Sequence, residues 1–274
     1  MKGKVYIVGA GPGDPELLTL KAARALSVAD VVLHDDLVTP EVLERVSPAA
    51  SVFSVGKRCG RKSVAQEEIN SLMVTYAQAG LTVVRLKGGD PSVFARSGEE
   101  IRTLRQAGVD FEIIPGVTAA TSAAAAAGIS LTERHLSSSI VFLTGHHCAS
   151  RSAEAAPGPR TAINVSRSSP GSPAMPAGAS PENSTFVVYM PSDYSALAAE
   201  LCAAGLKPET ACLIISGAST GKEETYFTTL AELPQAAPLL PPKILIVGAV
   251  VQQGAQGKSI SNEDSSLPVQ ANVR

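Results

Sequence analysis

The stretch 83-VVRLKGGDPSVFARSGEE-100 joins an apolar run to a charged helical pattern through Gly-Gly-Asp-Pro. An apolar run that ends in glycines before a helix is typical of a buried parallel strand, its turn and the helix that follows. Two explanations fit such a turn. It is either a tight bend with a purely structural role, or a place where a ligand approaches backbone that no side chain obstructs.

The same strand-then-helix pattern runs through the first half of the chain and indicates an α/β fold with a mainly parallel sheet covered by helices. We expect strands at 5–11, 30–36, 51–56, 82–86 and 110–116. Helices are expected at 15–26, 39–46, 64–80, 97–108 and 117–128. Asp14 as N-cap with Pro15 at the first helical position predicts the first helix start, and Ser63 with Gln66 forms a capping-box pattern for the third.

The second half again alternates strands and a helix, with strands expected at 139–147, 184–190, 211–219 and 243–251 and a helix at 195–206. We place the boundary near Ile114–Gly116, which predicts domains at 1–114 and 115–251. Residues 148–183 are rich in Ser, Pro, Ala and Gly, and residues 252–274 are polar without a period. Such composition predicts a flexible insertion and a disordered tail.

Composition limits the function. The 274 residues are 45% hydrophobic and 18% charged with a formal net charge of −2, which is typical of a soluble globular protein and gives no electrostatic case for nucleic acid or an anionic membrane. The four cysteines lie far apart without metal-ligand spacing and suggest reduced thiols. No apolar segment reaches the ~18 residues that span a bilayer. We therefore expect a cytoplasmic protein that binds no membrane.

Glycine turns follow three of the expected strands: "GAGPGDP" after the first, "GGDP" after the middle one and "PGVTAA" at the boundary. Ligands of open α/β sheets bind at the carboxyl ends of strands, so the three turns could line one crevice. Alone, "GAGPG" is compatible with a structural turn or a dinucleotide loop. Its spacing departs from G-x-G-x-x-G, however, and Pro12 removes one backbone donor.

Five blocks in order carry a resemblance: "VGAGPGDPELLTLKA", "ADVVLHDDLV", "VGKRCGRKSVAQEEIN", "VVRLKGGDPSVFARSGEE" and "PGVTAATSAAAAAGISLT". They resemble the uroporphyrinogen-III C-methyltransferases, a family of S-adenosylmethionine-dependent tetrapyrrole methylases. The resemblance implies two α/β domains with a donor-binding cleft between them, and a homodimer. It also implies methylation of uroporphyrinogen III at C2 and C7, giving precorrin-2 by way of precorrin-1 for siroheme or cobalamin synthesis.

The resemblance further implies roles for individual residues. The proton acceptor falls on Asp35 and the proton donor on Lys57. The S-adenosylmethionine site would comprise Pro12, Gly88, Gly89, Asp90, Val93, Thr118, Ala119, Met190 and Ala218. No metal is expected, because the sulfonium of the donor is already activated for methyl transfer.

The residue types suit this chemistry. The reaction needs an electron-rich pyrrole carbon held in line with the methyl group, and then a carboxylate to take a proton. The substrate carries eight carboxylates, which call for basic side chains. Candidates near the motifs are Arg58, Arg61, Lys62, Lys87, Arg96 and Arg134.

The chain departs from the family pattern in the opening stretch. Ser92 replaces an aromatic residue, and Ala95 and Ser97 replace glycines, so a different local backbone is expected if φ is positive at those two sites. Further departures are Lys62, Ala65, Glu133 and His135. Two alternatives therefore stay open: another precorrin methyltransferase of cobalamin synthesis, and a non-catalytic homologue that binds the donor or a tetrapyrrole. Because the first strand is expected at about Lys4, no dehydrogenase–chelatase module is expected before the methylase.

Overall fold

The computed structural model describes residues 3–56, 64–145, 180–237, 239–252 and 254 of the 274 in the chain. Contacts divide the chain into two units. Unit 1 comprises Met1–Ala123 with Gly217–Glu223, and unit 2 comprises Ala124–Ser216 with Glu224–Arg274. The domain limits expected from the sequence stay predictions. Most of the expected insertion and tail lies outside the described residues.

Unit 1 contains a five-stranded sheet in the order β3-β2-β4-β1-β5, and every neighbouring pair is parallel. Its strands are β1 (Lys4–Gly9), β2 (Val31–His34), β3 (Ser51–Ser54), β4 (Thr82–Lys87) and β5 (Asp110–Ile114). Its helices are α1 (Leu20–Ser27), α2 (Pro40–Leu43), α3 (Gln66–Gln78) and α4 (Ser97–Gln106), with the 3-10 turn η1 (Pro15–Leu17). The parallel, helix-covered sheet predicted from the alternating pattern is confirmed.

Two helix starts differ from the prediction. Asp14 does cap, but it caps η1, where its Oδ1 accepts from the N–H of Glu16 at 2.8 Å. The α-helix begins only at Leu20, because Thr19 provides a second cap by accepting from the N–H of Ala22 at 3.1 Å. Helix α3 begins after Ala65, and Ser63 lies outside the described residues.

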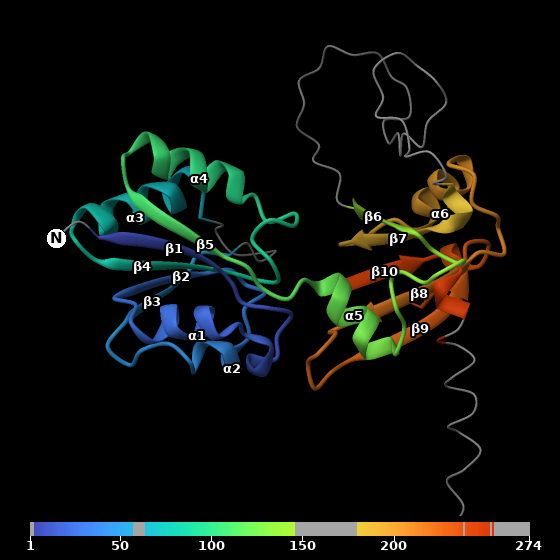
Figure 1. Cartoon of the computed structure of the whole chain (residues 1–274), viewed down its shortest axis with the longest axis horizontal. Coiled ribbons are helices and arrows are strands. Elements are labelled where there is room, and N and C mark those ends of the chain that lie inside the picture. Colours follow the sequence, from blue (N-terminus) through green and yellow to red (C-terminus); the bar gives the residue numbers. More distant parts are fainter. Residues whose placement is uncertain (1–2, 57–63, 146–179, 238, 253, 255–274) are drawn as a thin grey trace, which may run out of the picture. The chain divides into compact units, whose positions relative to one another are not determined.

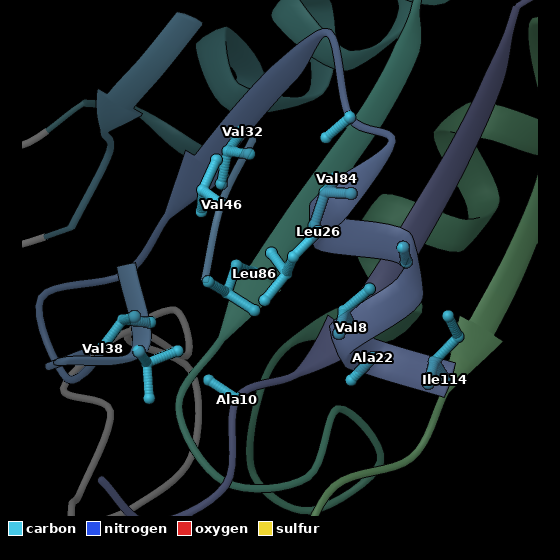
Figure 2. Close-up of a cluster of buried hydrophobic side chains, with 13 residues drawn as sticks. Val8, Ala10, Ala22, Leu26, Val32, Val38, Val46, Val84, Leu86 and Ile114 are labelled. Carbon is cyan, nitrogen blue, oxygen red and sulfur yellow. The ribbon is translucent and has the colours of Figure 1, made fainter. Parts of the chain in front are cut away.

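Alternate side chains of the strands build a hydrophobic layer on each face of this sheet. Helices α1 and α2 cover one face and α3 and α4 the other (Figure 1). Figure 2 shows the α1 side, where Val8, Val84 and Leu86 pack with Leu26 of the helix. On the opposite face, Ile7 and Val83 pack in a second cluster with Leu104 of α4.

The strand order places a topological switch point between β1 and β4. These strands are neighbours, yet β1 leads to α1 on one face and β4 leads to α4 on the other (Figure 1). The loops that leave their carboxyl ends therefore diverge, which leaves room for a ligand at that edge. The first two predicted glycine turns follow these two strands.

Unit 2 contains a second five-stranded sheet, in the order β6-β7-β10-β8-β9. Its strands are β6 (Ser139–Thr144), β7 (Ser184–Tyr189), β8 (Ala211–Ser216), β9 (Glu224–Thr229) and β10 (Lys243–Val247). Only β6 and β7 run parallel; β10 is antiparallel to both its neighbours, and β8 and β9 pair as antiparallel strands. Helix α6 (Tyr194–Ala203) packs on this sheet through Leu197 and Leu201.

The described residues form three further elements. Helix α5 (Ala119–Ala127) contains residues of both units. The 3-10 turns are η2 (Pro181–Asn183), which falls within the expected insertion, and η3 (Leu233–Gln235). Within the described ranges, every helix is too short or too polar to cross a membrane.

Candidate functional site

The first and middle glycine turns are joined by backbone hydrogen bonds. The N–H of Gly89 donates to the carbonyl of Gly11 at 2.7 Å, and the N–H of Gly11 donates to the carbonyl of Gly89 at 3.2 Å. Both residues have positive φ, 72° at Gly11 and 69° at Gly89, a conformation that favours glycine. The two loops at the switch point are therefore held together through main-chain atoms.

The third glycine turn lies against the other two. A Cβ on Gly116 would lie 2.4 Å from the carbonyl oxygen of Gly89, and one on Gly9 would lie 2.6 Å from the N atom of Gly116. The Oδ2 atom of Asp90 accepts from the N–H of Gly116 at 3.0 Å. The structure thus brings the three predicted turns together, and glycine is required there by close backbone approach.

Asp90 shapes its own loop as well. Its Oδ1 accepts from the N–H of Ser92 at 2.7 Å and from the hydroxyl of Ser92. Its carbonyl accepts from the N–H of Val93 at 3.2 Å. The carboxylate therefore stabilises the middle turn and links it to the third.

The departures at Ala95 and Ser97 do not strain the backbone. Between Asp90 and Ser97, positive φ falls on Phe94 (50°) and Arg96 (55°), one residue before each departure. Ser97 is the first residue of α4, and its hydroxyl donates to the carbonyl of Pro91 at 2.6 Å. The altered backbone considered from the sequence is therefore not required, and Ser97 closes the loop with a side chain that glycine lacks.

The segment that contains Ala218 also belongs to unit 1. A Cβ on Gly13 would lie 2.9 Å from Cγ2 of Thr220 and 3.2 Å from Cγ2 of Thr39. The hydroxyl of Thr39 donates to the carbonyl of Gly13 at 2.7 Å. The loop that carries Pro12 thus packs against both Thr39, at the start of α2, and Thr220 in residues 217–223.

Eight of the nine predicted donor-site residues fall in unit 1: Pro12, Gly88, Gly89, Asp90, Val93, Thr118, Ala119 and Ala218. Beyond its chain neighbours, the atom nearest to a Cβ built on Gly89 is the N atom of Ala119, at 4.0 Å, so the space beside Gly89 is open. The ninth, Met190, follows β7 of unit 2. It has positive φ of 52° and is 46% exposed.

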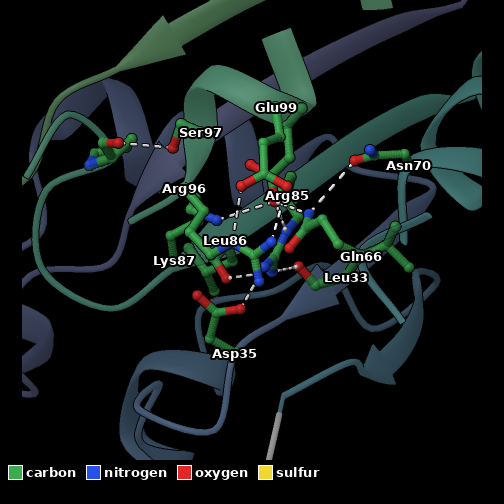
Figure 3. Close-up of polar contacts among 12 residues, drawn as sticks. Leu33, Asp35, Gln66, Asn70, Arg85, Leu86, Lys87, Arg96, Ser97 and Glu99 are labelled. Carbon is green, nitrogen blue, oxygen red and sulfur yellow. Dashed lines mark hydrogen bonds and ion pairs between the residues drawn. The ribbon is translucent and has the colours of Figure 1, made fainter. Parts of the chain in front are cut away.

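Asp35 follows β2 at the same edge of the unit 1 sheet. Its Oδ1 accepts from Nη2 of Arg85, and its N–H donates to the carbonyl of Leu86 at 3.1 Å (Figure 3). The side chain stays 29% exposed. Lys57, the predicted proton donor, lies outside the described residues, as do Arg58, Arg61 and Lys62.

Arg85 belongs to a buried charged network that the sequence-based prediction missed. Arg85 and Lys87 are each 2% exposed and Glu100 is fully buried. The Oε1 atom of Glu100 accepts from Nε of Arg85 at 2.9 Å and from Nζ of Lys87 at 3.0 Å. The ammonium of Lys87 is therefore buried against Glu100, whereas the motif predicted a basic side chain that is accessible to a substrate. The two basic residues at alternate positions of the apolar strand β4 could have indicated this buried network.

Burial and neighbouring charges shift the pKa values in this network. Burial lowers the pKa of Arg85, but the Asp35 and Glu100 carboxylates outweigh it and raise that pKa above its ordinary value. Burial and then the Arg85 charge lower the pKa of Lys87, against the opposing effect of Glu100. Arg85 is therefore a permanent cation beside Asp35.

The described residues contain no group of three or more His, Cys, Asp or Glu side chains that could hold a metal ion.

The remaining basic candidates are Arg96 and Arg134. Arg96 is half-exposed, and its guanidinium donates to both carboxylate oxygens of Glu99, at 2.9 and 2.8 Å. This contact holds the guanidinium at the end of the middle turn.

Three glycine turns at a switch point, with a carboxylate on the same edge, define a class of α/β protein that binds a small ligand against its backbone. Residues 4–234 match the family of tetrapyrrole (corrin/porphyrin) methylases, and the chain belongs to that family.

Relatives and a solved structure agree with this assignment. The S-adenosyl-L-methionine-dependent uroporphyrinogen III methyltransferase of Arabidopsis thaliana, named as chloroplastic, is 42% identical over 97% of this chain and 68% of its own. A siroheme synthase of Nitrosospira multiformis is 42% identical over 92% of this chain and 50% of its own, so the chain spans about half of that protein. The uroporphyrin-III C-methyltransferase of Thermus thermophilus, complexed with S-adenyl homocysteine, is 37% identical with a TM-score of 0.70, covering 91% of this chain and 99% of that one.

Proposed function

We propose that this chain transfers methyl groups from S-adenosylmethionine to C2 and C7 of uroporphyrinogen III, giving precorrin-2 by way of precorrin-1. The observation that carries the proposal is the meeting of the three glycine turns at the edge of the sheet where β2 leads to Asp35. The named activities of the Arabidopsis and Thermus relatives support the donor and the substrate. The product would serve siroheme or cobalamin synthesis.

The glycine turns fit the methyl donor because they offer bare backbone and open space. Gly89 has positive φ, and a Cβ built on it would lie 4.0 Å from the nearest atom beyond its chain neighbours, the N atom of Ala119. This space allows a ligand to lie directly against the main chain of Gly89. We assign the donor to Pro12, Gly88, Gly89, Asp90, Val93, Thr118, Ala119 and Ala218 of unit 1. The assignment of Met190 rests on the family resemblance alone. Met190 offers an exposed, adaptable apolar side chain for the adenine.

In the reaction the donor supplies a methyl group that is already activated on a sulfonium. A pyrrole ring carbon attacks that methyl carbon, the C–S bond breaks with its electron pair on sulfur, and the methylated ring then loses a proton. Asp35 takes this proton. It is partly exposed at the edge of the sheet, and Arg85 holds its carboxylate in one orientation.

The tetrapyrrole brings its own carboxylates, which Arg96 and Arg134 can meet. Arg96 ends the middle turn and is held by Glu99. Lys57 is assigned the proton-donor role. Because that role concerns the substrate, Lys57→Met is expected to leave donor affinity unchanged in calorimetry.

Anaerobic incubation with uroporphyrinogen III and S-adenosylmethionine carrying a radiolabelled methyl group tests the function. We expect label in the tetrapyrrole, and binding of S-adenosylhomocysteine to the protein in calorimetry. Donor binding without label transfer to any tetrapyrrole would instead favour the non-catalytic homologue. Transfer to a later precorrin, with none to uroporphyrinogen III, would favour another precorrin methyltransferase.

We also propose a cytoplasmic homodimer. The homodimer is implied by the family resemblance and is tested by light scattering of the purified chain, where a monomeric mass at micromolar concentration would contradict it. The cytoplasmic location is supported by the free thiols of Cys202 and Cys212, as in a reducing compartment, and is tested by cell fractionation.

A further inference from the structure

Glu100 lies at the centre of the buried network beneath the candidate site. It comes from the first turn of α4 and is fully buried. One oxygen, Oε1, accepts from Nε of Arg85 at 2.9 Å, Nζ of Lys87 at 3.0 Å and Nε2 of Gln66 at 3.3 Å. Two cations and an amide thus converge on a single carboxylate oxygen.

Arg85 extends from Glu100 to the segment that carries Asp35. Its Nε bonds Glu100, while its Nη2 donates to the Asp35 carboxylate. Its Nη1 donates to the carbonyl of Leu33 at 3.1 Å, two residues before Asp35 in the chain. The guanidinium therefore contacts both the side chain of Asp35 and the strand that leads to it.

The network buries charge where apolar residues would be enough for folding. Ile7, Val83 and Leu104 pack in the cluster on the same face of the sheet. Buried ion pairs generally stabilise a fold less than well-packed apolar residues of similar volume, because the charges lose their hydration. Stability alone gives no reason for Glu100, whereas the geometry of Arg85 does.

We propose that Glu100 is a positioning residue for methyl transfer, because it anchors Arg85 so that the guanidinium holds Asp35 in the orientation that accepts the proton. This inference rests on the proposed function, in which Asp35 is the proton acceptor. Glu100 is fully buried and accepts from Gln66, Arg85 and Lys87, so it acts on Asp35 through Arg85. Lys87 balances the charge of Glu100.

The test removes Glu100 together with its charge partner. In Glu100→Leu/Lys87→Met, Arg85 and Asp35 remain a balanced pair and no buried ion is left alone. We expect kcat for methylation of uroporphyrinogen III to fall on the order of 10- to 100-fold. The affinity for S-adenosylhomocysteine should stay within about twofold of wild type, because the glycine turns are unchanged.

A conservative partner variant separates positioning from packing. Glu100→Gln/Lys87→Met keeps an oxygen that accepts from Nε of Arg85, so we expect kcat between those of wild type and the apolar pair. If the Glu100→Leu/Lys87→Met protein fails to fold, the kcat of Glu100→Gln/Lys87→Met tests the positioning role by itself. A wild-type kcat in the folded variants overturns the inference, as does a loss of donor affinity that matches the loss of kcat. A wild-type protein that methylates no uroporphyrinogen III overturns the proposed function first, and the inference with it.

Discussion

Gly116→Ala is the sharpest perturbation of the three-turn arrangement. The new Cβ would lie 2.4 Å from the carbonyl oxygen of Gly89 and 2.9 Å from Cα of Gly9, whereas ordinary contact begins at 3.4 Å. The middle turn must therefore move by about 1 Å, and overpacking of this kind costs about 1–3 kcal/mol. We expect the melting temperature to fall by roughly 2–12 °C.

The same displacement should also impair function. A displacement of about 1 Å in a binding constellation costs on the order of 100-fold in rate. We expect kcat/KM to fall by about that factor. The Kd for S-adenosylhomocysteine should rise about tenfold, which corresponds to roughly 1.4 kcal/mol. Calorimetry and steady-state kinetics on the same preparation measure both quantities.

Gly98→Ala is the matched control. Gly98 lies in α4, and a Cβ there would meet only Nη1 of Arg102, at 3.9 Å. Alanine is favoured over glycine in a helix by up to about 1 kcal/mol, so this variant should bind the donor normally and melt no lower than wild type. If Gly116→Ala melts and binds the donor like Gly98→Ala, the close approach of the three turns has no role in donor binding.

Three further outcomes are expected. Asp90→Ala should abolish detectable donor binding in calorimetry and cost about 1–3 kcal/mol of stability, since the N–H groups of Ser92 and Gly116 lose their acceptor; unchanged donor affinity would reject this role. Thr19→Ala should cost about 1 kcal/mol in urea unfolding through the lost cap of α1, with kcat unchanged, and an altered kcat would count against a purely structural role. Burial, followed by the charge of Cys202, raises the pKa of the Cys212 thiol from 9.0 to about 12, so the folded state keeps a proton that the unfolded state loses. The unfolding free energy of the wild type should therefore fall as the pH rises from 9 to 12, and it should fall more steeply than that of Cys212→Ala. The difference in slope should reach up to about 1.4 kcal/mol per pH unit, and parallel pH curves for the two proteins would contradict this prediction.

Much of unit 1 could be predicted from the sequence because its signals are local. Apolar runs such as that of β4, and glycines such as Gly80 and Gly108 after helices, act within a few residues of the chain. The glycine turns were predicted from their places after strands. Their meeting at one edge followed from the parallel order of the strands, which the alternating pattern indicated.

The remaining features depend on residues far apart in the chain. Strand β9 (Glu224–Thr229) was not predicted, although its Thr, Tyr and Phe residues favour a strand; it pairs antiparallel with β8. The antiparallel direction of β10 likewise depends on its neighbours in the sheet. The sequence alone did not distinguish Glu100 from Glu99, the other acidic residue in the first turn of α4. Its burial follows from the packing of α4 over Arg85 and Lys87.

The mass of the tetrapyrrole product tests the central claim most directly. After anaerobic incubation of the folded protein with uroporphyrinogen III and excess S-adenosylmethionine, we expect a macrocycle that carries two added methyl groups and two equivalents of S-adenosylhomocysteine. A species with one added methyl group should precede it. Recovery of uroporphyrinogen III without any added methyl group, from protein whose folding is verified by circular dichroism, would contradict the proposed function.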